Sequence, residues 1–454
     1  MTVQVHTLYL PELREMLAEG DEAGLREFCT ALHPARTAEY MGGLTAEESW
    51  AVLQYADMPL RAEIFGFLDP DKQLRILETT NREEIAEFVA QLPPDDRVDL
   101  LKRVDPQVVQ ELLGLLPVEE RRDIQRLRAF PEETAGAEMT TDFARLSEDW
   151  TVGQALEEIS RQAEQMETIY YLYVVDDEDH LRGLVSARQL VAHMGKPNTL
   201  IRDLMERDIV TVRVGDDQEE VARKVARYDL LAIPVVDDEH RLVGIITHDD
   251  VLDVMVEEAV EDAQRAGGLE PLEDSYLNTP ILSLAKKRGV WLTLLFFGAF
   301  LTAVTLQGFG AELEKVAWLV VFLPLIVSTG GNSGSQSAAL ILTALATGTV
   351  SLRDWWRVVW RELLTGLALG AYLGVIGYGF ALLLARATYW EATVVPVTLL
   401  LVVTCGTLVG SLLPLLFKRL GWDPAYMSNP FVAVLIDVIG ILIYMGVAVA
   451  ILGV

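Results

Sequence analysis

Long apolar segments follow one another in the last part of the chain, after Arg288. We predict five membrane-spanning helices, at residues 290–307, 316–346, 360–384, 394–417 and 430–452. A helix needs about 20 apolar residues to cross a hydrocarbon core. The pattern therefore predicts a transmembrane domain at 286–454. An odd number of spans places the two ends of this domain on opposite sides of the membrane.

Cationic residues flank these segments unevenly. On one side lie Lys286, Lys287, Arg288, Arg353, Arg357, Arg361, Lys418 and Arg419, whereas the opposite loops hold Lys315 and Arg386. By the positive-inside rule the first side is cytoplasmic. Residues 1–16 lack the features of a signal peptide. We therefore expect a multi-pass protein with a cytoplasmic N-terminus and an extracytoplasmic C-terminus.

Short amphipathic patterns separated by helix breakers fill residues 1–132. The breakers Leu68-Asp69-Pro70, Leu92-Pro93-Pro94 and Leu116-Pro117-Val118 recur every 24 residues. A fixed period of this size is typical of a helical solenoid, with prolines in the first turns of its helices. This region is predicted to be an α-helical superhelix.

A different repeat, with β-type runs, occupies residues 133–254. Each unit has two apolar runs joined by an acidic turn, and the equivalent glycines Gly183 and Gly244 lie 61 residues apart. This resembles a tandem pair of α/β CBS domains, which implies adenine nucleotide as a candidate ligand. In that family a Ser or Thr followed three residues later by Asp holds the ribose.

Only the second repeat has this pattern, in Thr247 and Asp250; the first has Ser186 with Gln189. The resemblance therefore favours a single nucleotide site. The Thr247 hydroxyl could also cap the helix that follows, and both roles can hold at once.

Net charge separates the two parts of the chain. The chain has 37 Lys and Arg against 67 Asp and Glu, and seven of each group lie beyond residue 289, so the net charge of −30 belongs to the first part. Such an acidic region repels nucleic acid and attracts metal ions or basic partners. The six histidines are scattered and no phosphate-binding loop is present. The sequence does not predict an enzyme.

Residues 255–285 are predicted to form an acidic connecting helix and linker between the soluble and transmembrane domains. Acidic residues recur at helical spacing through Glu257, Glu258, Glu261 and Asp262. Like charges three or four residues apart destabilise a helix. The alternatives are a divalent-cation site and a solvated charged face.

Two polar features interrupt the apolar spans. Residues 328–337 read STGGNSGSQS, and the last span carries Asn429, Ala433 and Asp437 at intervals of four residues, which places them on one helix face. Packing of small residues can explain the first feature. A carboxylate at bilayer depth costs about 2.5 to 3.5 kcal/mol, so Asp437 should face a protein interior or a watery path.

The domain order, together with GGNSGSQS and SNPFVAVLIDV, resembles the MgtE family of bacterial magnesium channels. The resemblance implies a homodimer in the cytoplasmic membrane, with the last span of each protomer lining a shared pore. Asp437 would lie at the ion site, with Asn429 and Ala433 on the cytoplasmic side of it. Two carboxylates suit a hydrated Mg²⁺, and no His or Cys lies on this face to favour zinc or copper.

The resemblance also implies that cytosolic Mg²⁺ binds between the soluble domains and closes the pore. The matching acidic positions are Glu63, Asp95, Asp99, Glu219, Asp229, Asp249, Asp250 and Asp253, with Glu258, Glu261 and Asp262 near Asp423. Two other functions remain open: a secondary divalent-cation transporter, and a membrane-anchored nucleotide sensor.

Overall fold

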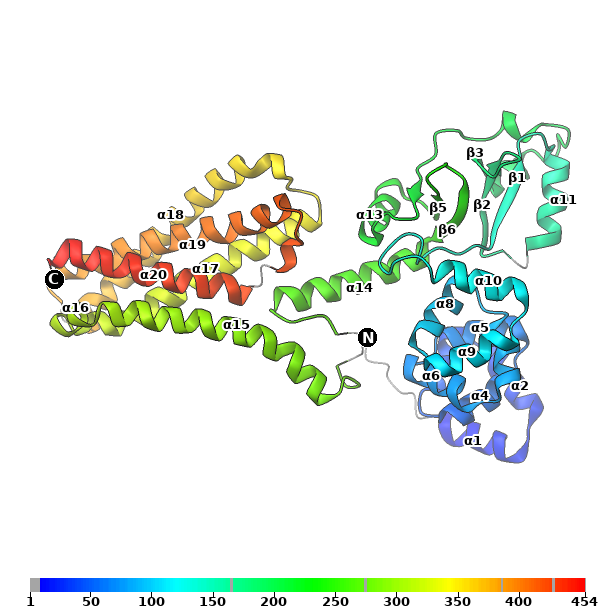
Figure 1. Ribbon diagram of the computed structural model, residues 1–454, viewed down its shortest axis with the longest axis horizontal. Coiled ribbons are helices and arrows are strands. Elements are labelled where there is room, and N and C mark those ends of the chain that lie inside the picture. The colour runs from blue at the N-terminus through cyan, green and yellow to red at the C-terminus, as the bar shows by residue number, and fades with distance from the viewer. Residues whose placement is uncertain (1–8, 164–165, 273–275, 385–386, 427–428, 454) are drawn as a thin grey trace. The chain divides into compact units, whose positions relative to one another are not determined.

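The computed structural model describes residues 9–163, 166–272, 276–384, 387–426 and 429–453. Ser428 of the SNPFVAVLIDV stretch and the flanking Arg386 lie outside these ranges. The chain forms two compact units, Met1–Met255 and Val256–Val454, which are described separately (Figure 1).

Short helices make up the first part of the first unit. They are α1 (Leu10–Glu19), α2 (Glu22–Ala31), α3 (Pro34–Tyr40), α4 (Ala46–Leu53), α5 (Met58–Gly66), α6 (Pro70–Thr79), α7 (Arg82–Val89), α8 (Pro94–Arg103), α9 (Pro106–Leu115) and α10 (Val118–Leu127). The predicted breakers lie at the starts of three helices: Pro70 and Pro94 are the first residues of α6 and α8, and Pro117 is the N-cap of α10. Proline suits a first helical position because the amide there needs no intrahelical partner. The 24-residue period is therefore a repeat of helix starts.

Arginine side chains tie several of these helices to the end of the preceding one. In α8, Arg97 donates hydrogen bonds to the carbonyl oxygens of Val89, Ala90 and Leu92 at 3.0, 3.0 and 2.7 Å. Arg61 of α5 binds the end of α4 in the same way. These carbonyls lack partners within their own helix, so the arginines satisfy them and fix the angle between neighbours.

Two similar three-stranded sheets complete the first unit. One contains β1 (Phe143–Ser147), β2 (Thr168–Val175) and β3 (Leu181–Ser186), and the other contains β4 (Val212–Arg213), β5 (Ala232–Val236) and β6 (Leu242–Thr247). Both pair their first two strands parallel and their last two antiparallel. Gly183 lies opposite Val174, as Gly244 lies opposite Val235. The predicted α/β repeat is therefore confirmed.

Helices α11 (Val152–Gln162), α12 (Ala187–Ala192) and α13 (Gln218–Tyr228) and the short η3 (Ile201–Asp203) accompany the sheets. One hydrophobic cluster joins α8 to the second repeat, through buried residues such as Val98, Leu101, Ile246 and Val251. The helical part and the second sheet thus share a core. Helix α14 (His248–Ala266) follows β6 and contains the boundary between the two units.

Long helices dominate the second unit. They are α15 (Ile281–Gly308), α17 (Trp318–Ala346), α18 (Trp355–Leu384), α19 (Val394–Arg419) and α20 (Asn429–Leu452); the shorter elements are α16 (Gly310–Lys315), η4 (Leu352–Asp354), η5 (Glu391–Thr393) and η6 (Pro424–Tyr426). Within the described residues, α15, α18, α19 and α20 are long and apolar enough to span a membrane. Helix α17 has 29 residues but carries the polar run.

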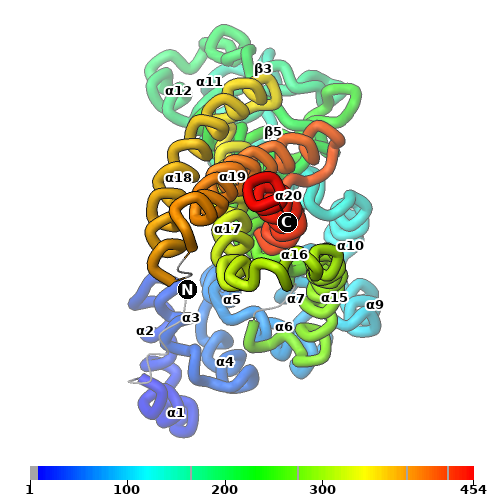
Figure 2. Tube along the Cα trace, turned by 90° about the vertical axis from the view of Figure 1, so that its left-hand side faces the viewer, coloured from blue at the N-terminus to red at the C-terminus, as the bar shows by residue number. Residues whose placement is uncertain are grey.

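Close helix packing organises this unit. Helix α20 contacts α15, α17 and α19, and α18 packs on the side of α19 that faces away from α20 (Figure 2). Gly366, Gly370 and Gly374 recur every four residues along the buried side of α18. A Cβ at Gly370 would lie 2.8 Å from Leu400 Cα, so glycine permits this approach.

Candidate functional site

The predicted polar face of α20 is half-buried. Asn429, Ala433 and Asp437 each keep intermediate exposure. Ser335 of α17 donates a 3.0 Å hydrogen bond to the carbonyl oxygen of Asn429. Among the described residues, the Asp437 carboxylate has no hydrogen-bond or ion-pair partner. A carboxylate inside an apolar helix without a protein partner is available to a cation.

Glycines of α17 make room beside this face. A Cβ at Gly331 would lie 3.3 Å from both Asp437 Oδ1 and Ala433 Cβ. On the other side, a Cβ at Gly406 of α19 would lie 2.7 Å from the carbonyl oxygen of Gly330. Packing thus accounts for part of the polar run, as the sequence allowed. Gly331 also lets the α17 backbone approach the unpaired carboxylate closely, because a Cβ there would lie tighter than ordinary van der Waals contact with Asp437 Oδ1.

A second carboxylate of the transmembrane unit was missed by the sequence reasoning. Glu362 of α18 is only 9% exposed and accepts a 2.7 Å hydrogen bond from the Ser337 hydroxyl of α17. Thr407 of α19 donates to the Glu362 carbonyl oxygen at 3.1 Å. Glu362 therefore links three helices. The available signal was a glutamate within an apolar helix.

In the first unit, several predicted carboxylates gather around Asp95, which lies in the first turn of α8. Asp95 is 8% exposed, and its Oδ1 has no hydrogen-bond partner among the described residues. Burial, reinforced by Asp250 and Asp96, raises the pKa of Asp95 well above its usual value. A buried carboxyl group with an unsatisfied oxygen is costly unless a proton or a cation neutralises it.

The neighbouring carboxyl groups respond to the same crowding. Burial and the charges of Asp99, Asp249 and Asp253 raise the pKa of Asp96. Burial, opposed by the hydrogen bond from Thr247, leaves the pKa of Asp250 raised to about 6. For Glu167, partial burial and the nearby Asp250 raise the pKa to about 7.

We call these residues the Asp95 cluster: Asp95, Asp96, Asp99, Glu167, Asp249, Asp250 and Asp253. The family resemblance pointed to five of its members but not to Asp96 and Glu167. Asp96 could have been found as the neighbour of Asp95, whereas Glu167 comes from the segment before β2 and gave no local signal.

Three other predicted positions lie outside the cluster. Glu63 is exposed on α5, and Glu219 in the first turn of α13 pairs with Arg223 at 3.3 Å. Asp229 ends α13 in a left-handed conformation, with φ of 51°. These positions remain candidates for cation binding on the strength of the resemblance.

Two of the three predicted neighbours of Asp423, Glu261 and Asp262, lie near it in the second unit. Arg265 of α14 donates a 2.7 Å hydrogen bond from Nη1 to Asp423 Oδ2 and also pairs with Glu261. Burial and the charge of Asp423 raise the pKa of Asp262. Glu258 lies one turn earlier on the same helix. The sequence missed Arg265, which supplies positive charge to a group that was expected to be only acidic.

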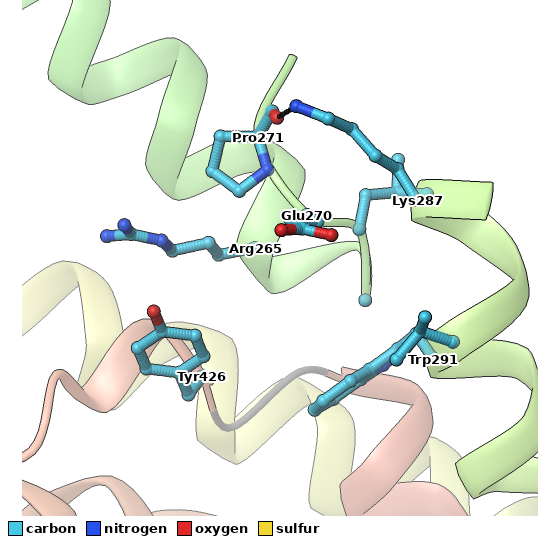
Figure 3. Close-up of a pocket in the computed structure, with 9 residues that line it drawn as sticks. Arg265, Glu270, Pro271, Lys287, Trp291 and Tyr426 are labelled. Atoms are coloured by element: carbon cyan, nitrogen blue, oxygen red, sulfur yellow. Dashed lines mark hydrogen bonds between the residues drawn. The ribbon is translucent and has the colours of Figure 1, made fainter. Parts of the chain in front are cut away.

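A pocket of about 270 Å³ opens beside this ion pair (Figure 3). Arg265 and Tyr426 lie on one side of it, and Trp291 and Lys287 of α15 lie on the other. Lys287 donates a hydrogen bond to the carbonyl oxygen of Pro271 at 2.5 Å. The connecting segment after α14 is thereby held against the start of α15.

Thr247 and Asp250 interact directly at the start of α14. The Thr247 hydroxyl is 2.5 Å from Asp250 Oδ2 and from Asp249 Oδ1, and the Thr247 amide donates to Asp250 at 3.2 Å. The hydroxyl therefore lies within hydrogen-bonding distance of two carboxylates and can donate its single proton to one of them at a time. Ser186, in contrast, forms a capping box with Gln189. In the first repeat, the residue that departs from the nucleotide-binding pattern, Gln189, therefore serves to cap a helix.

No group of three or more His, Cys, Asp or Glu side chains within the described ranges is arranged to hold a metal ion. The Asp95 cluster offers dispersed acceptors around one buried, unsatisfied oxygen. This donor set fits Mg²⁺, which binds oxygen and usually keeps several waters that can reach separated carboxylates.

Comparison with known sequences matches this architecture. Residues 323–447 match the family MgtE, described as divalent cation transporter, residues 32–133 match the MgtE intracellular N domain, and residues 135–196 and 201–257 match CBS domains. The chain is 43% identical over 331 residues to the magnesium transporter MgtE of Thermus thermophilus, which covers 72% of each protein. The chain belongs to the MgtE family. The MgtE of Enterococcus faecalis is 38% identical over 331 residues, covering 72% of this chain and 71% of that one.

Solved structures of MgtE relatives share the fold of the soluble part. One is the soluble part of a magnesium transporter, 35% identical with a TM-score of 0.52, covering 55% of this chain and 97% of that one. Another is the cytosolic domain of the Mg²⁺ channel MgtE in complex with ATP, 39% identical with a TM-score of 0.50, covering 53% and 98%. This MgtE family member is thus a membrane transporter homologue with a cytosolic N-terminal part, and is not an enzyme.

Proposed function

We propose that the protein is a magnesium-selective channel that admits Mg²⁺ to the cytoplasm as a homodimer, and that cytosolic Mg²⁺ closes it. The observation that carries this proposal is the unpaired carboxylate of Asp437 in an apolar helix of a magnesium transporter homologue. Two copies of Asp437 around a twofold axis would balance the charge of one Mg²⁺. Because Mg²⁺ loses its waters reluctantly, the ion would pass with part of its hydration shell.

Small residues next to Asp437 support passage of a hydrated ion. Ala433 lies one turn before Asp437, and Gly331 of α17 is the residue whose added Cβ would press on both of them. A larger residue at either position would narrow the region around the carboxylate. Asn429 would supply an amide at the cytoplasmic end of the same face.

For the gate, the Asp95 cluster is the main sensor of this proposal. Glu63, Glu219 and Asp229, and separately Glu258, Glu261, Asp262 and Asp423, complete the predicted regulatory ligands. Repulsion between carboxylates favours separation of their helices when cations are scarce, and a divalent cation reverses this preference.

Shifting a two-state gate from 1:99 to 99:1 takes about 5.5 kcal/mol. One weak site filled to a few times its dissociation constant supplies only about 1 kcal/mol. The gate therefore requires several ions acting together.

Adenine nucleotide is a further ligand in this proposal. Thr247 and Asp250 would hold the ribose at one site, in keeping with the ATP complex of the related cytosolic domain. Asp250 also belongs to the Asp95 cluster, so nucleotide and Mg²⁺ would affect each other.

The decisive experiment compares Asp437→Asn with the wild type in proteoliposomes, using a fluorescent Mg²⁺ indicator inside the vesicles. We expect the substitution to lower Mg²⁺ flux by roughly tenfold or more, which corresponds to about 1.4 kcal/mol. The matched control is Glu314→Gln, an exposed acidic residue of α16. Unchanged flux in Asp437→Asn would remove the basis of the proposal.

Planar-bilayer recordings then separate a channel from a carrier. Unitary currents with Mg²⁺ as the sole charge carrier are expected. Their absence, together with Mg²⁺ flux that depends on a proton or Na⁺ gradient, would instead favour a secondary transporter in which Asp437 titrates.

A further inference from the structure

The cytoplasmic end of α18 carries an exposed surface of arginines and tryptophans that the transport proposal does not use. Arg353, Arg357 and Arg361 are all exposed. Trp355, Trp356 and Trp360 are 52%, 54% and 50% exposed. We propose that this surface binds the headgroup of an anionic phospholipid from the cytoplasmic leaflet.

The geometry of α18 separates this surface from the packed side of the helix. Val358, Glu362 and Gly366 recur every four residues and are buried against the neighbouring helices. Arg357 and Arg361, also four apart, form a stripe on another face, and Trp356 and Trp360 form the stripe beside it. The arginines and tryptophans therefore remain available to a ligand outside the helix bundle.

The length of α18 places the surface at headgroup depth. Its 30 residues span about 45 Å at 1.5 Å per residue, whereas the hydrocarbon core is about 30 Å thick. The apolar sequence continues to Leu384, so the excess of about ten residues falls at the Trp355 end. Arg357 and Arg361 lie within this excess, where lipid phosphates are found.

Charge favours an anionic ligand over a zwitterionic one. Within the described residues of η4 and α18, the acidic side chains are Asp354, which pairs with Arg357 at 3.3 Å, and Glu362, which is buried on the other side. The Arg357 side chain is still 87% exposed. Helix α19 packs beside η4 and ends in Lys418 and Arg419, which add positive charge.

Phosphate and aromatic chemistry together identify a lipid as the ligand. Arginine binds phosphate through two parallel hydrogen bonds. The ring of Trp356 meets that of Trp360 edge-on at 6.1 Å, and tryptophan prefers the membrane interface, where its ring contacts acyl chains and its N–H reaches polar groups. A free phosphate ion would use the arginines but gain nothing from the rings.

Native mass spectrometry of the full-length protein in detergent tests the proposal, with dioleoyl phosphatidylglycerol and dioleoyl phosphatidylcholine as the two probes. The wild type should retain phosphatidylglycerol preferentially. Each cationic residue near an anionic surface contributes about a fivefold preference, so Arg357→Gln/Arg361→Gln should lower it by about 25-fold. Arg357→Lys/Arg361→Lys should keep most of the preference, because the charge remains.

The control Arg26→Gln/Arg126→Gln removes two exposed arginines from the first unit and should leave lipid binding unchanged. A Gln variant that keeps the full preference would overturn the proposal. Competition by soluble glycerol 3-phosphate at equal concentration would overturn it in favour of a free phosphate site. If the Gln variant dissociates into monomers while its lipid preference is unaltered, the surface belongs to a contact with a second copy of the chain. None of these measurements depends on ion flux, so failure here leaves the proposed function untouched.

Discussion

Asp95 combines burial, an unsatisfied oxygen and several acidic neighbours in one side chain. Its protonation therefore bears on the stability of the first unit. A carboxyl group whose pKa is higher in the folded than in the unfolded state stabilises the fold when protonated. That stability is complete below the unfolded pKa and is lost as the pH rises through the folded pKa. For Glu167 the window runs from about 4.5 to about 7, and for Asp250 from 3.8 to about 6.

We therefore expect the full-length protein in EDTA to have a higher unfolding temperature for its first unit at pH 5.5 than at pH 7.5. Asp95→Asn should raise the unfolding temperature at pH 7.5, because no charge has to be buried. The exposed Glu87→Gln on α7 is the matched control and should have little effect. Differential scanning calorimetry across pH measures both effects, and a fall in the unfolding temperature of Asp95→Asn would contradict the electrostatic account.

At the level of elements, glycines determine how closely the transmembrane helices approach. Helices α17 and α19 touch through backbone at Gly330, Gly334, Gly406 and Gly410. Without a hydrophobic driving force between helices in lipid, such contacts and interhelical hydrogen bonds hold the bundle together. The Ser337 to Glu362 hydrogen bond adds a polar link between α17 and α18.

The glycine contacts between α17 and α19 predict that two glycine substitutions differ in their effect on the stability of the protein. Gly410→Ala would place a Cβ against the carbonyl oxygen of Gly334 and should cost about 1 to 3 kcal/mol of stability, the range for overpacking. Gly379→Ala on α18 has no atom within 4 Å of the added Cβ and should be neutral or slightly stabilising. Unfolding by sodium dodecyl sulfate in mixed micelles, followed by circular dichroism, compares the two. Equal destabilisation would show that backbone contact between α17 and α19 is not what matters.

At the level of the whole molecule, charge and function are distributed unequally. The soluble part carries the net charge of −30, whereas the chain beyond residue 289 has as many cationic as acidic residues. A divalent cation therefore acts mainly on the soluble part, while the transmembrane unit presents few charges to it. In the proposed mechanism, the gate and the pore would therefore respond to different concentrations of Mg²⁺.

Millimolar Mg²⁺ should make the soluble part of the full-length protein more resistant to limited proteolysis, with a steep dependence on concentration. The reason is that bridging cations remove repulsion among the acidic groups. Asp95→Asn/Asp250→Asn should shift the protection to higher Mg²⁺. NaCl at matched ionic strength is the control for general screening. Equal protection by NaCl, or no protection by Mg²⁺, would count against the gate.

Local patterns determined much of this protein. The 24-residue spacing of breakers gave the starts of α6, α8 and α10, because proline in a short helix is favoured at the start and not in the interior. Runs of apolar residues gave the long helices within a few residues, except that α15 and α18 begin earlier, at Ile281 and Trp355, since their cationic flanks also suit a helix. The isolated carboxylate of Asp437 was visible for the same reason: its neighbours in sequence are all apolar.

Tertiary structure alone decided which distant residues meet. Arg265 and Asp423 are 158 positions apart, and Ser337 and Glu362 are 25 apart, yet each pair shares a hydrogen bond. Glu167 joins Asp95 although nothing in its own segment indicates an acidic cluster. The periodicity of apolar residues indicates which side of its own helix or strand a residue lies on. These contacts depend instead on how separate elements pack against one another. That packing is determined by the whole hydrophobic core and not by any local pattern.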